Sequence, residues 1–228
     1  MTREEQDQLA VESHAKAAYA RKNGLFAKEI IPVKTVQYDK QGNEKQVTIS
    51  QDDGIREGTT LKVLGKLRPA FKKNGTTTAG NSSQISDGAA AVVLARRSFA
   101  EKHGLPIVAR LSGSAVAGLP PRIMGIGPVF AIPKVLKQTG LKLEDIDLFE
   151  INEAFASQAA YCTRKLGLDK TKVNPKGGAI ALGHPLGMTG ARMVGALITE
   201  LQRTNKRRGI ASMCMGGGFG MAAVIELE

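Results

Sequence analysis

The sequence is poor in cysteine, histidine and aromatic residues, and each shortage narrows the range of functions. Two cysteines among 228 residues are too few for a disulfide framework, which favours a reducing compartment. The three histidines, His14, His103 and His184, lack the spacing of a zinc site, so no metal centre is expected. With no Trp, three Tyr and seven Phe, the chain is not expected to stack nucleic-acid bases.

Long apolar runs and acidic residues are also scarce. No stretch reaches the ~20 apolar residues of a membrane span, and residues 1–6 do not resemble a signal or transit peptide. The 32 Lys and Arg exceed the 21 Asp and Glu, giving a net charge of +11. Because the basic residues are spread along the chain, most are expected to be solvated, with a phosphorylated small ligand as the alternative.

The first 87 residues are predicted to hold little regular structure after an opening helix. Thr2 and Glu5 form a capping-box pattern, and Gly24 is a typical stop. Residues 30–50 favour short extended segments around a turn at 41–43. Residues 51–87 are rich in Gly, Thr and Ser and predict a long, irregular, functional passage.

From residue 88 the pattern alternates between strands and helices, which predicts a layered α/β sheet. The apolar run 88–95 predicts a strand that is covered on both faces. We expect the remaining strands near 107–117, 146–151, 210–213 and 221–225. We expect helices at 98–103, from Pro133 onward, at 153–166 and at 190–202.

Reactive side chains gather in three late segments, 150–155, 177–187 and 214–220, where strands are expected to end. Other known motifs do not fit these segments. The glycines near 183–190 lack the Lys of a phosphate-binding loop, and those after Cys214 do not fit a dinucleotide fingerprint. No serine has the glycine neighbours of a hydrolase nucleophile.

Spacing distinguishes the two cysteines. Cys162 lies with Phe155, Ala159 and Leu166 on one helical stripe, which predicts a buried structural thiol. Cys214 ends a strand before three glycines, whose backbone N–H groups could approach a substrate oxygen. From spacing alone, a reactive and a structural role are equally open for Cys214.

Two polar residues also keep alternative interpretations. His184 lies among Gly183, Pro185 and Gly187, so it is on no helix face, and a lone histidine can be purely structural. Asn152 could serve only as a helix cap, a position that asparagine favours.

Together these segments resemble the thiolase family over essentially the whole chain. Within the family the chain is most similar to the peroxisomal 3-ketoacyl-CoA thiolases, in 81–88 and 152–162. The matching motifs are Asn-Glu-Ala-Phe-Ala at 152–156, Gly-Gly-Ala-Ile-Ala-Leu-Gly-His-Pro at 177–185, Cys-Met-Gly-Gly-Gly at 214–218, Lys-Leu-Arg-Pro-Ala-Phe at 66–71 and Thr-Ala-Gly-Asn-Ser-Ser at 78–83.

The resemblance implies a catalytic set. His184 is implied as the base that activates the nucleophile, and Cys214 as the acid/base at the α carbon of acetyl-CoA. Asn152 is implied to hold a water that, with His184, stabilises the enolate oxygen. The backbone N–H of Gly216 is implied to supply half of a second oxyanion hole.

It also implies how substrate is held. Coenzyme A acts as a substrate, and no resident cofactor or metal is expected. Arg56 matches a position at the phosphate-bearing end of CoA, Ser83 one on the pantetheine arm, and Met124 one near the acyl group. Val63 replaces a serine of some relatives, which removes one polar contact with CoA.

The family places its nucleophilic cysteine in an N-terminal half-domain, which is expected to be missing here. We therefore expect a thiolase α/β/α sheet with three parts: the remainder of the loop domain at 1–87, the last strand and helix of the N-terminal half-domain at 88–104, and the C-terminal half-domain at 105–228.

Partners and location follow from the same resemblance. CoA thioesters, a homodimer or tetramer and a peroxisomal location are implied, and no nucleic acid is expected. Two hypotheses remain open: a thiolase chain without its nucleophile, and a non-catalytic isoform that binds CoA or dimerises.

Overall fold

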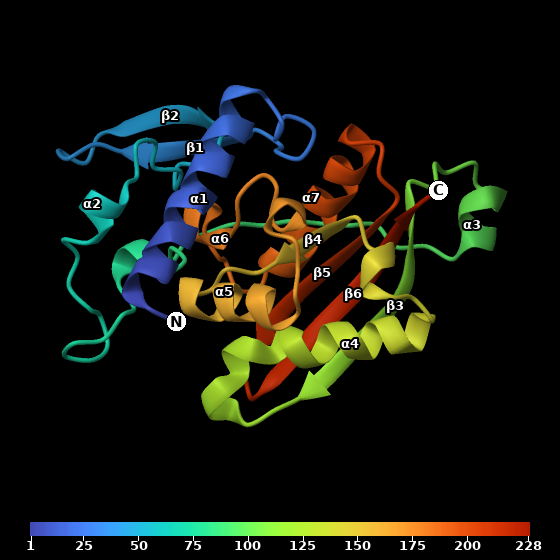
Figure 1. The fold of residues 1–228 in the computed structure, drawn as a ribbon. Helices are drawn as coiled ribbons and strands as arrows, with labels where there is room; N and C mark the ends of the chain where they lie inside the picture. Colours follow the sequence, from blue (N-terminus) through green and yellow to red (C-terminus); the bar gives the residue numbers. More distant parts are fainter.

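A four-stranded mixed sheet forms the centre of the computed structural model, which describes residues 1–228 (Figure 1). The strand order is β3-β6-β5-β4, with β5 antiparallel to β6 and parallel to β4. The sheet strands are β3 (Ala109–Gly118), β4 (Leu148–Ile151), β5 (Arg208–Met215) and β6 (Phe219–Leu227). The helices are α1 (Arg3–Lys22), α2 (Leu61–Leu64), α3 (Arg97–Lys102), α4 (Gly127–Thr139), α5 (Ala156–Lys165), α6 (Ala179–Leu182) and α7 (Thr189–Arg203).

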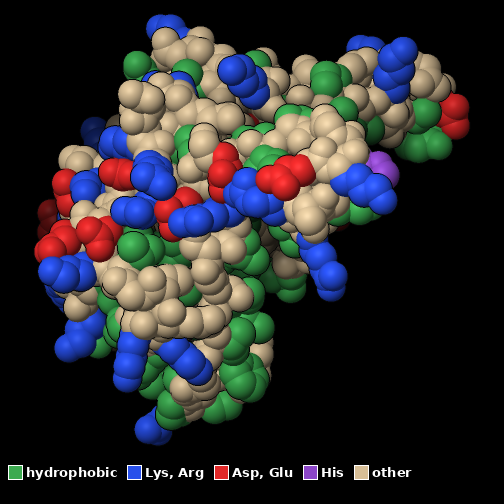
Figure 2. Space-filling model, turned by 90° about the vertical axis from the view of Figure 1, so that its right-hand side faces the viewer, with side chains coloured by type: hydrophobic (Ala, Val, Ile, Leu, Met, Phe, Trp, Pro, Cys, Tyr) green, Lys and Arg blue, Asp and Glu red, His purple; other side chains and the backbone are tan.

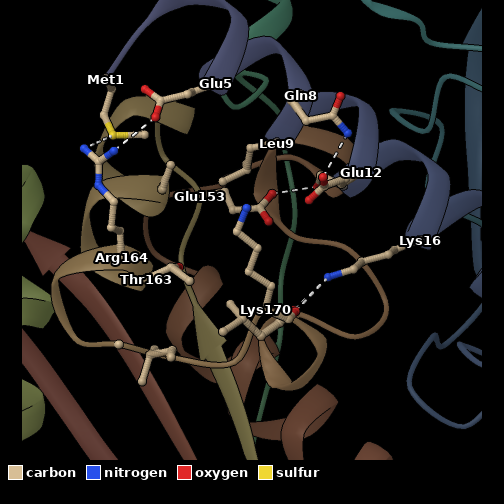
Figure 3. Close-up of a pocket in the computed structure, with 15 residues that line it drawn as sticks. Met1, Glu5, Gln8, Leu9, Glu12, Lys16, Glu153, Thr163, Arg164 and Lys170 are labelled. Atoms are coloured by element: carbon tan, nitrogen blue, oxygen red, sulfur yellow. Dashed lines mark hydrogen bonds and ion pairs between the residues drawn. The ribbon is translucent and has the colours of Figure 1, made fainter.

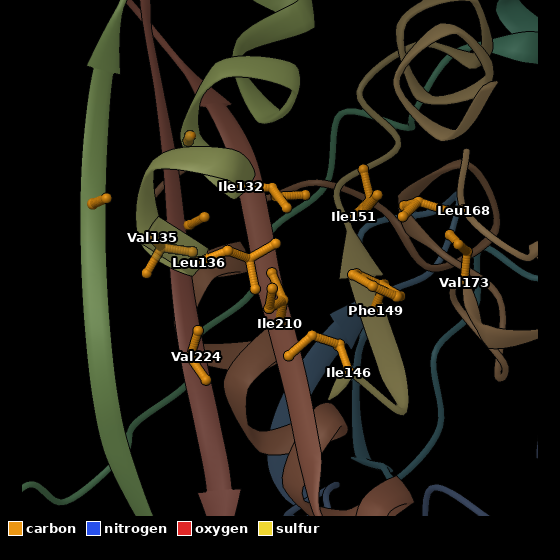
Figure 4. Packing of buried hydrophobic residues seen from close by; sticks show 13 residues of the cluster. Ile132, Val135, Leu136, Ile146, Phe149, Ile151, Leu168, Val173, Ile210 and Val224 are labelled. Atoms are coloured by element: carbon orange, nitrogen blue, oxygen red, sulfur yellow. The ribbon is translucent and has the colours of Figure 1, made fainter. Parts of the chain in front are cut away.

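The sheet is covered on both faces, which gives the expected α/β/α layers. Alternate residues of a strand point to opposite faces. On β5, Ile210 therefore joins the core beneath α4, whereas Ala211 joins the core beneath α7. The larger core contains Phe149, Ile132 and Val224 (Figure 4). Each large apolar side chain buried in this way stabilises the fold by roughly 1.5–3 kcal/mol.

The first helix begins and ends as its sequence predicts. The Thr2 hydroxyl accepts from the Glu5 N–H, and the Glu5 carboxylate accepts from the Thr2 N–H. Gly24 adopts a positive φ of 66° just after the helix end. The apolar stripe of α1 is fully buried at Ala10 and Ala17 and packs against α5 and α6.

The expected hairpin is also confirmed. Strands β1 (Val33–Tyr38) and β2 (Glu44–Ile49) pair in antiparallel register beside α1 (Figure 1). Both strands expose most of their residues to solvent. The passage from residue 51 to 87 is irregular apart from α2 and a short 3-10 turn, Ala79–Asn81.

The predicted strand at 88–95 is wrong for this structure. These residues form no secondary structure, and Val93 is 93% and Leu94 75% exposed. A strand needs a neighbouring strand to pair its backbone N–H and C=O groups, and no strand pairs with this segment. The edge strand β3 likewise exposes Leu111 and Val116. Figure 2 shows apolar side chains exposed between scattered Lys and Arg on this side of the molecule.

Two helix boundaries also differ from the prediction. α4 begins at Gly127, six residues earlier than expected, with Pro128 in its first turn and Pro133 in its interior. α5 begins at Ala156, because residues 152–154 are not helical and Phe155, at the cap position, has extended backbone angles. No helix of the chain combines the length and apolar character that crossing a membrane requires.

A glycine contact brings α4 onto the sheet. A side chain on Gly127 would lie 2.6 Å from the Gly220 Cα and 2.8 Å from the Phe219 carbonyl oxygen. Only a residue without Cβ lets the helix start approach β6 this closely. The contact lies beside the glycine turn that follows Cys214.

Candidate functional site

Three of the predicted residues lie where the parallel strands β4 and β5 end. Asn152 directly follows β4, and its N–H donates to the Ser212 carbonyl oxygen on β5 at 3.0 Å. Cys214 lies two residues farther along β5, on the same strand face as Ser212. The carboxyl ends of parallel strands are where sites form in layered α/β proteins. His184 joins this edge from the loop between α6 and α7.

Hydrogen bonds on both sides fix the imidazole of His184. Its Nε2 lies 3.1 Å from Asn152 Nδ2, and its Nδ1 lies 2.7 Å from Thr189 Oγ1. Its backbone N–H donates to the Gln84 carbonyl oxygen at 3.1 Å. Burial, and then the charge of Arg192, lower the pKa of His184. The ring is therefore neutral near pH 7, as a general base must be.

Asn152 is more than a helix cap. It is almost fully buried, and α5 starts four residues later with Phe155 at its cap position. Its side chain instead contacts His184, and its Oδ1 atom is buried without a hydrogen-bond partner. A buried amide oxygen without a partner is costly, so the atom is available for a donor from a water or a substrate.

Cys214 lies at the end of β5 against the glycine turn. Burial raises the pKa of its thiol, so the group is protonated at neutral pH and able to donate a proton. Gly217 and Gly218 adopt positive φ angles of 85° and 94°, which L side chains rarely reach. Around Gly216 the space is open, because a Cβ added there would meet nothing within 4 Å.

The structure confirms Cys162 as a core thiol. It has no exposed surface, and burial raises its pKa to about 12. Ala159 shares the buried stripe, but Phe155 does not. Phe155 precedes α5, is 37% exposed and meets Phe71 edge to face. Cys162 is therefore not a nucleophile in this fold.

Glu153 is a residue of the site region to which sequence reasoning gave no role. Its buried carboxylate accepts from Ser13 Oγ at 2.6 Å, from Asn174 Nδ2 at 2.8 Å and from the Ile180 N–H at 3.4 Å. It thus ties α1 to the segment that leads into His184. In the sequence, only the glycine pair 177–178 indicates this close contact, because a Cβ on Gly178 would lie 2.3 Å from the carboxyl carbon of Glu153.

The three predicted substrate-binding residues, Ser83, Met124 and Arg56, lie in different parts of the structure. The Ser83 N–H donates to the Ala154 carbonyl oxygen at 2.9 Å, which places Ser83 beside the Asn152 segment. Met124 is 37% exposed on a turn (Pro121–Ile126) that packs against α5. Arg56 is exposed near α1, where its N–H donates to Nδ1 of His14 at 3.1 Å. No contact joins Arg56 to the His184 cluster.

One cavity lies away from His184 and Cys214. It measures about 470 Å³ and opens between α1 and α5 (Figure 3). Glu5, Glu12 and Glu153 line it together with Lys16, Arg164 and Lys170, so neither sign of charge dominates. Neither His184 nor Cys214 lines this cavity.

The fold and the site define a thiolase-type protein, and this chain belongs to the thiolase family. A sequence model of the family's C-terminal domain matches residues 105–227. A model of the N-terminal domain matches residues 1–98, so the expectation that the N-terminal half is missing is not confirmed. The chain spans about half the length of the curated relatives it matches.

Curated relatives and solved structures agree with this family assignment. The chain is 59% identical over 227 residues to human peroxisomal 3-ketoacyl-CoA thiolase, covering 99% of this chain and 54% of that protein. It is 60% identical to 3-ketoacyl-CoA thiolase 2, peroxisomal, of Arabidopsis thaliana, over 99% of this chain and 50% of that protein.

Among solved structures, the dimeric peroxisomal thiolase of Saccharomyces cerevisiae matches with a TM-score of 0.88 and 51% identity, over 100% of this chain and 55% of that one. Human mitochondrial 3-ketoacyl-CoA thiolase in complex with CoA matches with a TM-score of 0.93 and 44% identity, over 100% and 55%.

Proposed function

We propose that this chain supplies the acid/base half of a 3-ketoacyl-CoA thiolase. That enzyme cleaves a 3-ketoacyl-CoA with coenzyme A to acetyl-CoA and a shortened acyl-CoA, as fatty-acid β-oxidation requires. The observation that carries the proposal is the contact of His184 with Asn152 at the edge of the sheet where Cys214 also lies. A neutral imidazole, a buried amide and a protonated thiol are the groups that this chemistry needs besides a nucleophile.

The proposed reaction runs in two halves. A cysteine thiol outside this chain loses its proton to His184 Nε2, and the thiolate attacks the keto carbon of the substrate. The bond between the α and β carbons then breaks, and its electrons form the acetyl-CoA enolate. Cys214 protonates the α carbon, while Asn152 and the N–H of Gly216 stabilise developing oxyanions. Coenzyme A finally gives its thiol proton to the Cys214 thiolate and takes the acyl group, and the released cysteine recovers its proton from His184.

Residues 1–87 are proposed to form the CoA-binding part. Ser83 lies beside the Asn152 segment, where the pantetheine arm would end, and Met124 borders the space for the acyl group. Arg56 is exposed and cationic, so it is free to meet a phosphate group at the far end of CoA. The complex of the human mitochondrial relative with CoA supports this substrate class.

Assembly and location are proposed on the same basis. The yeast relative is a dimeric peroxisomal thiolase, and the curated relatives are named peroxisomal. We propose a peroxisomal homodimer or tetramer, in which residues 88–104 complete an N-terminal half-domain and residues 105–228 form the C-terminal one. The exposed Val93 and Leu94 support this assignment, since a neighbouring layer would cover them.

The test is thiolysis of acetoacetyl-CoA by this chain, alone and joined to the residues that precede the matched region in its relatives. We expect no turnover from the chain alone and turnover from the joined protein. In the joined protein, His184→Ala should lower the rate at least ~100-fold, the usual size of a general-base effect. His103→Ala is the matched control, because His103 is exposed beside α3. Equal rates for the two variants would disprove the proposal.

A further inference from the structure

The Thr189 hydroxyl makes two contacts that together determine where His184 carries its proton. Thr189 is the first residue of α7 and is almost fully buried. Its Oγ1 lies 2.7 Å from His184 Nδ1 and 2.9 Å from the Pro185 carbonyl oxygen. The hydroxyl thus bridges the imidazole and the backbone of the loop that carries it.

The count of protons decides the direction of both bonds. A threonine hydroxyl has one proton to donate, and a carbonyl oxygen can only accept. The contact with Pro185 is therefore a hydrogen bond only if the Thr189 proton lies on it. Oγ1 then offers a lone pair to His184, so Nδ1 must carry a proton. In the reverse arrangement, two oxygen lone pairs would face each other at 2.9 Å.

The other side of the ring leads to the same assignment. Asn152 Nδ2, a donor only, lies 3.1 Å from His184 Nε2, and this contact requires a lone pair on Nε2. Asn152 comes from the end of β4 and Thr189 from the start of α7, so the two observations are independent. The tautomer with Nδ1 protonated is the one that satisfies all three contacts.

We propose that Thr189 is a positioning residue, which holds His184 in the Nδ1–H tautomer, so that Nε2 is the ring nitrogen able to accept a proton. The catalytic role of this tautomer rests on the proposed function, but the assignment of the proton to Nδ1 does not. When Nε2 takes a thiol proton, Nδ1 keeps its bond to Thr189. The ring therefore changes charge without turning, which a group that takes up a proton in one half of a reaction and returns it in the other needs.

The chain contains its own reference for a test. His14 Nδ1 accepts the Arg56 N–H at 3.1 Å, so His14 must be protonated at Nε2, the opposite tautomer. With only three histidines in the chain, ¹⁵N-histidine labelling gives few signals, and a His103→Gln variant removes one. ¹⁵N NMR of the labelled chain at pH 8 then reports which nitrogen of each ring carries the proton. No substrate is needed.

Two substitutions distinguish the effect of the Thr189 hydroxyl on the His184 tautomer from the effect of side-chain packing. Thr189→Ser keeps the hydroxyl, and Thr189→Val keeps the shape without it. We expect Nδ1–H at His184 in the wild-type chain and in Thr189→Ser. In Thr189→Val, the Nδ1–H population should fall relative to the wild-type chain, because only the Asn152 contact then favours it, while the His14 signal stays unchanged as a sign of an intact fold.

Two results would overturn the inference: Nε2–H at His184 in the wild-type chain, or full retention of Nδ1–H in Thr189→Val. If His14 changes as well, the valine variant has lost its fold, and the wild-type and serine spectra decide the question. Failure of thiolysis in the joined protein would remove the proposed function but leave this tautomer assignment standing.

Discussion

Replacing Glu150 with Gln should stabilise the chain at pH 8. Glu150 lies on β4 with its side chain toward α7, where only 3% of it is exposed. Its Oε2 lies 3.3 Å from Arg192 Nη1, but Arg192 itself reaches solvent. Burial raises the pKa of Glu150 from 4.5 to about 7, and the nearby Arg192 only partly offsets this rise. The ionised carboxylate is therefore unfavourable in the folded state.

The size and sign of the effect follow from this pKa. A rise from 4.5 to about 7 corresponds to about 3 kcal/mol, and relaxation around a buried ion pair should reduce this to roughly 1–3 kcal/mol. Between these two pH values the folded chain binds the proton more tightly than the unfolded chain does. Stability therefore falls as the pH rises through this window, and the penalty is complete above about pH 7. A glutamine side chain at this position cannot ionise, so the variant should lack this loss.

Urea unfolding followed by circular dichroism at pH 5 and pH 8 measures the difference. We expect Glu150→Gln to be more stable than the wild-type chain by roughly 1–3 kcal/mol at pH 8, with a much smaller difference at pH 5. The raised pKa of Asp52, caused by burial, affects both proteins equally and cancels.

Glu226 on β6 supplies the matched control. Burial acts to raise its pKa, but the hydrogen bond from Ser112 and the ion pairs with Arg208 and Arg110 outweigh burial and lower it. A carboxylate whose folded pKa is lowered stabilises the fold above its unfolded pKa, and the stability is lost as the pH falls. Glu226→Gln should therefore destabilise the chain at pH 8. A Glu150→Gln variant that is less stable than the wild-type chain at pH 8 would refute the reasoning.

Two further predictions concern packing and exposure. Gly127→Ala should lower the free energy of unfolding by roughly 1–3 kcal/mol, because its Cβ would overlap Gly220. Gly195→Ala has open space around it inside α7 and should raise the free energy of unfolding by up to about 1 kcal/mol. Thermal unfolding compares the two variants, and equal effects would contradict the close contact. The chain alone should bind a hydrophobic dye through the exposed Val93 and Leu94. Replacing both residues by Lys should reduce the dye fluorescence. A wild-type chain that binds no dye would show that this segment is covered.

Local signals in the sequence predicted much of the fold. The capping box at Thr2 and Glu5, the hairpin around residues 41–43 and the strands on either side of the Gly216 turn all appear as expected. These elements depend on contacts between residues close in sequence. The segment 88–95 failed because its strand character depends on partners far away, which apolar composition alone does not provide.

The site was predictable as a set of segments, but not as a set of contacts. Asn152 and His184 were singled out, and the structure joins them at 3.1 Å. The buried bonds of Glu153 to α1, and the bridge that Thr189 makes to His184, could not be predicted. Such contacts depend on side-chain conformations across elements up to 140 residues apart in sequence, for which periodicity and spacing give no signal.

The central claim is that Cys214 exchanges protons with the α carbon of acetyl-CoA. The direct measurement is deuterium incorporation into acetyl-CoA by the joined protein, with acyl labelling from an acyl-CoA measured in parallel. The core thiol Cys162 offers the control, Cys162→Ala. A serine hydroxyl is a far weaker acid than a thiol, whose pKa is about 8.5 when unperturbed.

Cys214→Ser should therefore take up the acyl group normally, yet exchange α protons at least ~100-fold more slowly. His184→Ala should impair both reactions, and Cys162→Ala neither. If Cys214→Ser exchanges deuterium at the wild-type rate, Cys214 is a structural thiol and the proposed mechanism is wrong at its central residue.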